Sequence, residues 1–405
     1  MIDKRSSHIK NILHGFFLSI GTTVAEPATI LPLIVNYFSS NSMIIGIFAS
    51  LLKGGAIFVQ MISAFYAQSY RYMMPYLRIV FISRFLSWFG IGVVIAIFGE
   101  DSPQLTLTLI GIGLFIFSFS AGFGAIYFKE IQAKVFSNSF RGKTMAYRQF
   151  FSGLGAILSG ATAGVILQNF EPPMSFAYLF MISALIMGIG LVAFASIEEP
   201  PKEEIKEKEK SFIKFLKNSM RYFREDQNLR KQVISYTLSY GHLLALPFII
   251  LQAEKELDLD GFTIGMFVSV QMLGAMLSNI IWGKLSFKEK NIDIVIVSYI
   301  LMITSFSLAM FFQNIYIYSL IFFLIGASTD GLRLAFGNLI LIVAPKDKRP
   351  VYIALQANIS SIGLFFPIVG GVLLKFIDYE FLYGLTITML LYGLFYMRST
   401  HEKVV

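Results

Sequence analysis

Long apolar stretches separated by shorter polar segments run through the chain. A helix that crosses a membrane needs about 20 mainly apolar residues, and twelve stretches meet this length. Strands are excluded, because open strands leave backbone groups unpaired in lipid and barrel strands alternate polar and apolar positions. The pattern predicts an all-α membrane protein with twelve transmembrane helices, at residues 11–37, 43–68, 75–98, 104–128, 145–168, 174–196, 232–255, 261–284, 292–312, 315–341, 349–374 and 379–398.

The two halves of the chain carry related sequences in the same orientation. Residues 45–56 (IGIFASLLKGGA) and 264–275 (IGMFVSVQMLGA) are identical at six positions, and Pro27 matches Pro247 further upstream. A repeat of this period indicates a duplicated architecture. We therefore expect two pseudo-symmetric six-helix bundles, with an N-terminal bundle at residues 1–197, a linker at 198–231 and a C-terminal bundle at 232–405.

The linker is the one strongly polar stretch of the chain. Within it, residues 211–225 (SFIKFLKNSMRYFRE) place apolar side chains at helical spacing among lysines and arginines. This pattern is typical of an amphipathic helix that lies in the membrane surface. The alternative interpretation is a solvated connector that only joins the halves.

Basic residues are distributed unequally between the predicted loops. If the N-terminus lies inside, the inner segments hold 28 of the 33 Lys and Arg residues, and the outer loops hold only Lys255 and Lys375. The positive-inside rule then places both termini in the cytoplasm, in a bacterial-type inner or plasma membrane. The same distribution explains the net charge of +8 without a nucleic-acid partner. The first apolar run is too long for a signal peptide, so we expect it to be retained.

The composition agrees with lipid as the solvent and narrows the chemistry. Only 14% of the residues are charged, compared with about 25% in a soluble domain. The chain has no cysteine, which excludes disulfides, thiolate metal sites and a cysteine nucleophile. No nucleophile–base pair, metal-ligand spacing or phosphate-binding loop stands out. We therefore expect neither an enzyme nor a bound cofactor or metal.

Charged side chains within the predicted spans are the first candidates for function, because a charge in hydrocarbon is costly and usually faces a cavity or an opposite charge. Glu26 and Lys53 each lie about 15 Å from the outer end of their span, at about 1.5 Å per residue, so they are plausible partners near the midplane. Asp330 and Arg333 share one helix face. Arg84 has no obvious partner in the sequence.

These five residues hold three positive and two negative charges, an excess that favours an anionic or zwitterionic solute. Glu26 is also a candidate proton carrier, because burial and a neighbouring lysine act on its protonation in opposite directions. The structural alternative for each is an ion pair or a side chain that extends to the membrane surface.

Uncharged polar side chains within the second-half spans complete the predicted pathway. A histidine in a span is often only a hydrogen-bonded structural residue, and the same holds for amides and hydroxyls. The candidates are Tyr240, His242, Gln271, Asn338, Gln356 and Asn358.

Two parallel six-span halves, a charged central loop and inner termini resemble the major facilitator superfamily. After the eighth span, residues 282–288 (WGKLSFK) are similar to the family's loop signature, with Phe287 at the acid position. By this resemblance Gly283 and Lys284 are gating residues, and Arg141 fits the family's common Arg-Gly before the fifth span. The first-half loop, residues 63–71, lacks the acid, which puts charge-relay gating there in doubt.

The resemblance implies alternating access by a rocking motion, with a site near the midplane lined by spans 1, 4, 7 and 10. Residues 363–371 are similar to the antiporter motif of drug exporters, although that motif belongs on the fifth span. We expect a monomeric secondary active transporter of a small organic solute, coupled to protons or another ion. Efflux of amphipathic compounds by proton antiport is one alternative, and a non-transporting receptor or scaffold of the same fold is another.

Overall fold

The computed structural model describes residues 4–67, 70–202, 220–345 and 349–401, and these residues are almost entirely helical. Within the described residues there is no strand, and ten helices are long and apolar enough to cross a membrane. This confirms the predicted all-α membrane fold. The other two predicted spans are residues 11–37 and 43–68. The first corresponds to a helix that is interrupted within residues 4–38, and the second to a helix at Ser42–Ala67 in which some side chains are not described.

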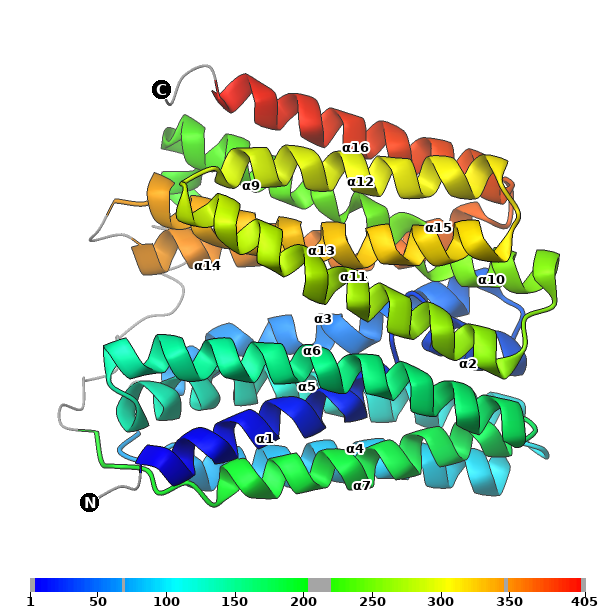
Figure 1. Cartoon of the computed structure of the whole chain (residues 1–405), viewed down its shortest axis with the longest axis horizontal. Coiled ribbons are helices and arrows are strands. Elements are labelled where there is room, and N and C mark those ends of the chain that lie inside the picture. The colour runs from blue at the N-terminus through cyan, green and yellow to red at the C-terminus, as the bar shows by residue number, and fades with distance from the viewer. Residues whose placement is uncertain (1–3, 68–69, 203–219, 346–348, 402–405) are drawn as a thin grey trace. The chain divides into compact units, whose positions relative to one another are not determined.

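Most predicted spans are continuous helices, and several extend beyond the predicted bounds (Figure 1). The fifth span begins seven residues before the predicted position 145, because the polar residues ahead of it are also helical. The continuous helices are α3 (Ser42–Ala67), α4 (Met74–Phe98), α5 (Pro103–Val135), α6 (Asn138–Asn169), α7 (Met174–Ala195), α11 (Gly261–Phe287), α12 (Asn291–Phe311), α13 (Ile315–Val343) and α16 (Tyr379–His401).

Three spans predicted as single helices are interrupted instead. Each break contains or directly precedes a proline, which lacks the N–H that continues a helix but fits its first turn. Pro27 lies in the first break, and its repeat partner Pro247 and Pro367 lie at the start of the helices that follow the other two breaks. The segments are α1 (Lys4–Thr23) and α2 (Ile30–Phe38); α9 (Gln227–Ser239), the 3-10 turn η1 (Tyr240–Leu244) and α10 (Leu246–Leu257); and α14 (Arg349–Ser360), η2 (Ser361–Phe365) and α15 (Phe366–Leu373).

The chain divides into two compact units, and each takes one short segment from the opposite half of the sequence. Unit 1 is Met1–Ser40, Leu51–Lys210 and Asp260–Ser269, and unit 2 is Asn41–Ser50, Ser211–Leu259 and Val270–Val405.

Unit 1 is built around α1, which packs along α6 and α7, while α4 packs along α5 and α7 (Figure 1). The fully buried Trp88 ties three of these helices together. Its Nε1 donates to the carbonyl of Gly21 at 3.0 Å and to Ser183 Oγ at 3.1 Å. The first turns of α11 also belong to this unit, where Ser269 Oγ donates to the carbonyl of Ile157 at 3.0 Å.

In unit 2, α12 packs along α13 and α16, and α16 packs along α9 (Figure 1). The fully buried Tyr299 donates from its hydroxyl to the carbonyl of Ser235 at 2.6 Å. The start of α3 belongs to this unit, because Ser42 Oγ donates to the carbonyl of Gly371 at 2.6 Å.

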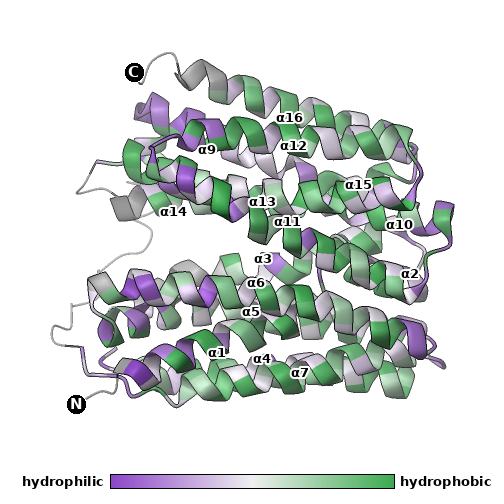
Figure 2. Cartoon of the chain, viewed as in Figure 1, coloured by the Kyte–Doolittle hydropathy of each residue, from purple (hydrophilic) through white to green (hydrophobic). Residues whose placement is uncertain are grey.

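The helix surfaces are apolar over most of their length, and polar residues gather mainly at helix ends (Figure 2). Large apolar side chains are exposed along these surfaces, including Ile79 (66%), Val192 (70%) and Phe395 (68%). In water, contiguous apolar surface of this extent drives association. We conclude that these surfaces face lipid.

The predicted surface helix at residues 211–225 lies mostly outside the described residues. Residues 220–225 are helical, and α9 follows directly. Asp226 caps α9, with Oδ1 accepting from the main-chain N–H of Asn228 at 2.9 Å and of Leu229 at 3.1 Å. The other carboxylate oxygen accepts from the hydroxyl of Tyr352 at 2.8 Å.

The close approach of α3 and α15 within unit 2 depends on a glycine. A Cβ at Gly46 would collide with the main-chain carbonyl of Pro367, whereas a Cβ at Gly54, on the same helix, would meet nothing within 4 Å. We expect Gly46→Ala to destabilise the protein by about 1–3 kcal/mol, the usual cost of overpacking. Thermal unfolding in detergent measures this, with Gly54→Ala as the matched control. Equal melting temperatures for the two variants would contradict the observed packing.

Candidate functional site

The break in the first span places a carboxylate inside unit 1. Residues 24–29, between α1 and α2, are not helical, and the half-buried Glu26 lies in this segment beside Pro27. The carbonyl of Glu26 accepts from the main-chain N–H of Thr29 at 3.1 Å and of Leu31 at 3.3 Å. The break therefore satisfies the carbonyl of Glu26 within the local turn.

Lys53, the predicted partner of Glu26, is exposed on α3. The ion pairs seen among the described side chains do not include one between these two residues. Both residues were predicted at the same depth, near the midplane, but an equal depth does not determine whether two side chains point toward each other.

Arg84 lies within α4, and its guanidinium covers the ring of Phe117 at 4.4 Å. Its Nε atom is buried and has no hydrogen-bond partner among the described residues. Arg84 had no obvious charged partner in the sequence, and none of the ion pairs among the described residues includes it.

Two further polar residues in the interior of unit 1 were not predicted. His14 on α1 is 2% exposed, and Arg148 on α6 donates from Nη2 to its Nδ1 at 3.1 Å. Position 148 lies within the predicted fifth span, but Arg148 was counted with the basic residues of the inner segments and not as an interior charge. In the sequence, His14 could have been noticed as a single histidine within the apolar run at residues 11–37.

In unit 2, Asp330 and Arg333 on α13 form the expected ion pair, with 2.7 Å between Arg333 Nη2 and Asp330 Oδ1. Asn279 on α11 donates from Nδ2 to Asp330 Oδ2 at 2.7 Å. The aspartate side chain is 15% exposed and the arginine side chain 65%. The acid is therefore held from two helices, while most of the arginine remains free to contact other groups.

A second polar group in unit 2 joins α9, α13 and α14. Gln232 and Gln356 are buried; Gln232 Nε2 donates to Gln356 Oε1 at 3.3 Å. Gln356 Nε2 donates to the carbonyl of Phe336 at 3.3 Å. On the span that carries Gln232, the hydroxyl of Tyr240 donates to the hydroxyl of Tyr236 at 3.3 Å. Of these side chains, Gln232 has a buried Oε1 without a hydrogen-bond partner among the described residues.

The remaining candidates of the second half have local structural contacts. His242 is 7% exposed in η1, and its Nδ1 donates to the carbonyl of Ser239 at 2.6 Å, which fixes the hydrogen on that nitrogen. Gln271 is buried on α11, and its main chain packs closely against Gly326. Asn358 on α14 is half-buried, and its carbonyl accepts from Ser361 Oγ at 2.6 Å.

Asn338, predicted to line the pathway, holds the loop between α11 and α12. Its Nδ2 donates to Ser286 Oγ at 2.8 Å and to Asn291 Oδ1 at 3.2 Å. The predicted gating residues Gly283 and Lys284 lie just ahead of this loop, on the exposed side of α11.

The neighbouring Trp282 is buried and donates from Nε1 to the carbonyl of Ala327 at 3.0 Å. It anchors the end of α11 on α13, a role that the sequence did not indicate. Arg141, the gating candidate of the first half, is half-buried in the first turn of α6, where its main-chain N–H donates to the carbonyl of Ser137 at 2.8 Å.

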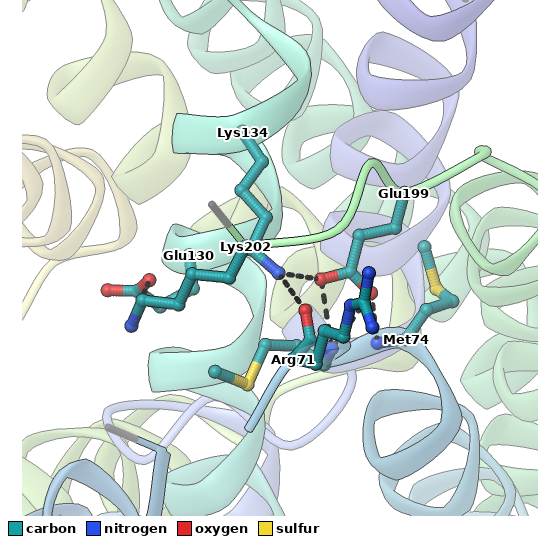
Figure 3. Close-up of polar contacts among 7 residues, drawn as sticks. Arg71, Met74, Glu130, Lys134, Glu199 and Lys202 are labelled. Carbon is teal, nitrogen blue, oxygen red and sulfur yellow. Dashed lines mark hydrogen bonds and ion pairs between the residues drawn. The ribbon is translucent and has the colours of Figure 1, made fainter. Parts of the chain in front are cut away.

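A clasp joins three segments at one end of unit 1: the loop between α3 and α4, the end of α5 and the start of the linker (Figure 3). Glu199 accepts from the main-chain N–H groups of Met73 at 2.8 Å and Met74 at 2.7 Å, at the positive end of the α4 dipole. Lys134 forms an ion pair with Glu199 and donates to the carbonyl of Arg71 at 3.0 Å.

The linker segment adds a second row of contacts to this clasp (Figure 3). The main-chain N–H of Lys202 donates to the carbonyl of Arg71 at 3.1 Å, and its Nζ lies 3.8 Å from Glu130 Oε2. The acid next to this loop is thus Glu199, which bonds the start of α4 and lies 126 residues further along the chain from Met73. Sequence reasoning missed this because it searched for the acid within the loop.

No group of three or more His, Cys, Asp or Glu side chains that could hold a metal ion occurs in the described part of the chain.

Comparison with known families gives a match over nearly the whole chain. A model described as Major Facilitator Superfamily matches residues 11–246 and 232–404. Comparison with curated proteins finds no match.

Solved transporter structures have the same fold at low sequence identity. A mutant of the nucleoside transporter NupG is similar with a TM-score of 0.76 and 11% identity, covering 97% of this chain and 99% of its own. A bacterial homologue of the iron transporter ferroportin gives 0.73 and 10%, covering 98% and 99%. The xylose transporter XylE from E. coli gives 0.66 and 13%, covering 99% and 95%.

Loss of the Glu199 charge should release the clasp. Glu199 is 2% exposed as a side chain, so Glu199→Gln leaves Lys134 without its partner in a largely buried setting. We expect hydrogen exchange at Met73 and Met74 to become at least about 10-fold faster, because a hydrogen bond to a charged group contributes about 1.5–3 kcal/mol. Exchange measured by mass spectrometry should remain unchanged in the control Glu198→Gln, whose side chain is exposed.

Proposed function

The chain belongs to the Major Facilitator Superfamily, and on that premise we propose that it is a secondary active transporter that moves a small organic solute by alternating access. The observation that carries this proposal is the half-buried Glu26 at the break in the first span. A membrane protein without transport has little reason to retain a carboxylate and a broken helix at that depth. The family and the fold favour a transporter over an enzyme.

We propose that the solute is anionic or zwitterionic. The charges inside the spans support this, since Arg148 adds a fourth cation to Lys53, Arg84 and Arg333, against two acids. The solved transporters of the same fold are named for nucleosides, xylose and iron, so the fold alone does not select a solute class. Efflux of amphipathic compounds by proton antiport is the second candidate, favoured by the glycine- and proline-rich residues 363–371.

Proton coupling is proposed from the chemistry of a single carboxylate. Glu26 lies where helix geometry is interrupted, and a carboxyl group can hold a proton in one conformation and release it in another. Asp330 is a less suitable carrier, because Arg333 and Asn279 already occupy its two carboxylate oxygens.

The proposed setting is a bacterial-type inner or plasma membrane, with both termini and the clasp on the cytoplasmic side. The excess of basic residues in the corresponding loops supports this orientation. In this orientation the clasp and the loop held by Asn338 lie where cytoplasmic gating takes place, and Arg141, Gly283 and Lys284 belong to the same region. We propose residues 1–197 and 232–405 as the two bundles that alternate, with 198–231 as their linker.

Solute-induced pH change in proteoliposomes, screened with a panel of metabolites and drugs, tests transport and coupling together. We expect one solute class to move protons in wild type and the flux to fall at least about 10-fold in Glu26→Gln, because an amide cannot carry a proton. Glu100→Gln removes an exposed acid outside the interior and should leave the flux unchanged. Solute flux without proton movement would refute coupling through Glu26, and absence of any flux across the panel would favour a receptor or scaffold.

Arg333 tests the charge of the solute. Because its side chain is largely exposed while Asp330 stays bonded to Asn279, Arg333→Gln should raise KM for an anionic solute about 10-fold or more with little change in kcat, as expected for loss of uniform binding. Uptake of radiolabelled solute measures both constants, and Lys290→Gln, an exposed cation in a loop, is the control. An unchanged KM would argue against an anionic substrate at this residue.

A further inference from the structure

Two arginines and a buried histidine meet inside unit 1 without an acidic partner. Arg148 Nη2 lies 3.1 Å from His14 Nδ1. Phe81, one turn before Arg84 on α4, stacks on His14 with 5.5 Å between ring centres. Through this contact α4 brings Arg84 into the same part of the interior of unit 1 as His14.

The contact between Arg148 and His14 determines where the histidine hydrogen lies. A guanidinium has donors only, so His14 Nδ1 must be the acceptor, and the neutral ring carries its hydrogen on Nε2. His14 Nε2 is buried and has no partner among the described residues, and the same is true of Nε of Arg84 and Nε of Arg148. The cluster therefore presents three unpartnered donors.

Aromatic rings stabilise the two charges only in part. The Arg84 guanidinium lies 4.4 Å from the centre of the Phe117 ring, and that of Arg148 lies 4.9 Å from Phe128. Such contacts use the face of the guanidinium and leave its N–H groups in need of acceptors. None of the ion pairs formed by the described residues includes either arginine. What the cluster lacks is negative charge with several acceptor atoms.

Polar side chains continue from this cluster along α1. Asn11, one turn before His14, accepts from Gln132 Nε2 at 2.9 Å and donates to Thr144 Oγ1 at 3.2 Å. His8, a further turn back, lies 2.6 Å from the same hydroxyl. A strip of polar groups thus connects the cluster with the first turns of α1.

We propose that Arg84, Arg148 and His14 form a binding site for a small oxyanion within unit 1. A carboxylate or phosphate supplies the missing negative charge and offers two or more acceptors, which match the forked donors of arginine. The three unpartnered donors are buried, while the arginine side chains as a whole are half-buried. The oxyanion is either a group of an organic solute or a free inorganic anion. This site rests on the proposed anionic class of solute and deepens it, because it names the residues that would hold the negative group.

Thermal unfolding of the purified full-length protein in detergent tests the site, with inorganic phosphate and acetate titrated separately at constant ionic strength. We expect a saturable rise of several degrees in the Tm of wild type. Arg84→Gln and Arg148→Gln should weaken the response about 10-fold or more. Arg78→Gln is the matched control, since Arg78 lies on the same helix but donates to the carbonyl of Ala195 at the surface of unit 1.

The two anions distinguish the sources of the ligand. A response to acetate as well as phosphate supports a carboxylate site for an organic solute, and a response to phosphate alone supports a site for an inorganic oxyanion. The proposal is wrong if neither anion stabilises wild type, or if the glutamine variants respond like wild type.

If the glutamine variants do not fold, Arg84→Lys and Arg148→Lys replace them. An ammonium keeps the charge but lacks the forked geometry, so we expect a weaker response, and an unchanged one would contradict the site. These results are independent of the flux measurements, so failure of the oxyanion site leaves the transport proposal standing.

Discussion

Hydrocarbon offers no hydrogen-bond partner, and most features of this fold follow from that constraint. Every main-chain N–H and C=O within the membrane must be satisfied by the protein itself, which restricts the chain to helices. Where a proline removes a donor, as at Pro27, Pro247 and Pro367, the helix stops and local turns take over the bonding. The interruptions are therefore confined positions at which main-chain atoms and nearby side chains become available for other contacts.

The same constraint separates two ways of holding a charge in unit 1. Glu199 is almost fully covered, yet two main-chain N–H groups and Lys134 neutralise it, so it serves as a structural fastener. Arg84 and Arg148 are half-buried against aromatic rings, with donors that the described protein does not satisfy. A buried charge with its partners in place stabilises an assembly, whereas one without them indicates that something else completes it.

Much of the fold could be predicted from the sequence because hydropathy reports directly on burial in lipid. The Asp330–Arg333 pair was also predictable, since a spacing of three residues on one helix fixes its geometry. The exposed position of Lys53 and the interior role of Arg148 were not, because they depend on which way each helix face points. The clasp of Glu199 and the anchoring of Trp282 required partners distant in sequence, which a single chain without related sequences does not reveal.

The division of the chain has a consequence for its history. Residues 41–50 belong to the unit built mainly from the second half, and residues 260–269 belong to the unit built mainly from the first. These segments overlap the two copies of the repeated sequence. An ancestral half-length gene product would have had to obtain this segment from a second copy of itself, as symmetric dimers do when they exchange an element. Fusion of the two copies would then have turned an exchange between molecules into one within a single chain, after which each half was free to diverge while remaining dependent on the other.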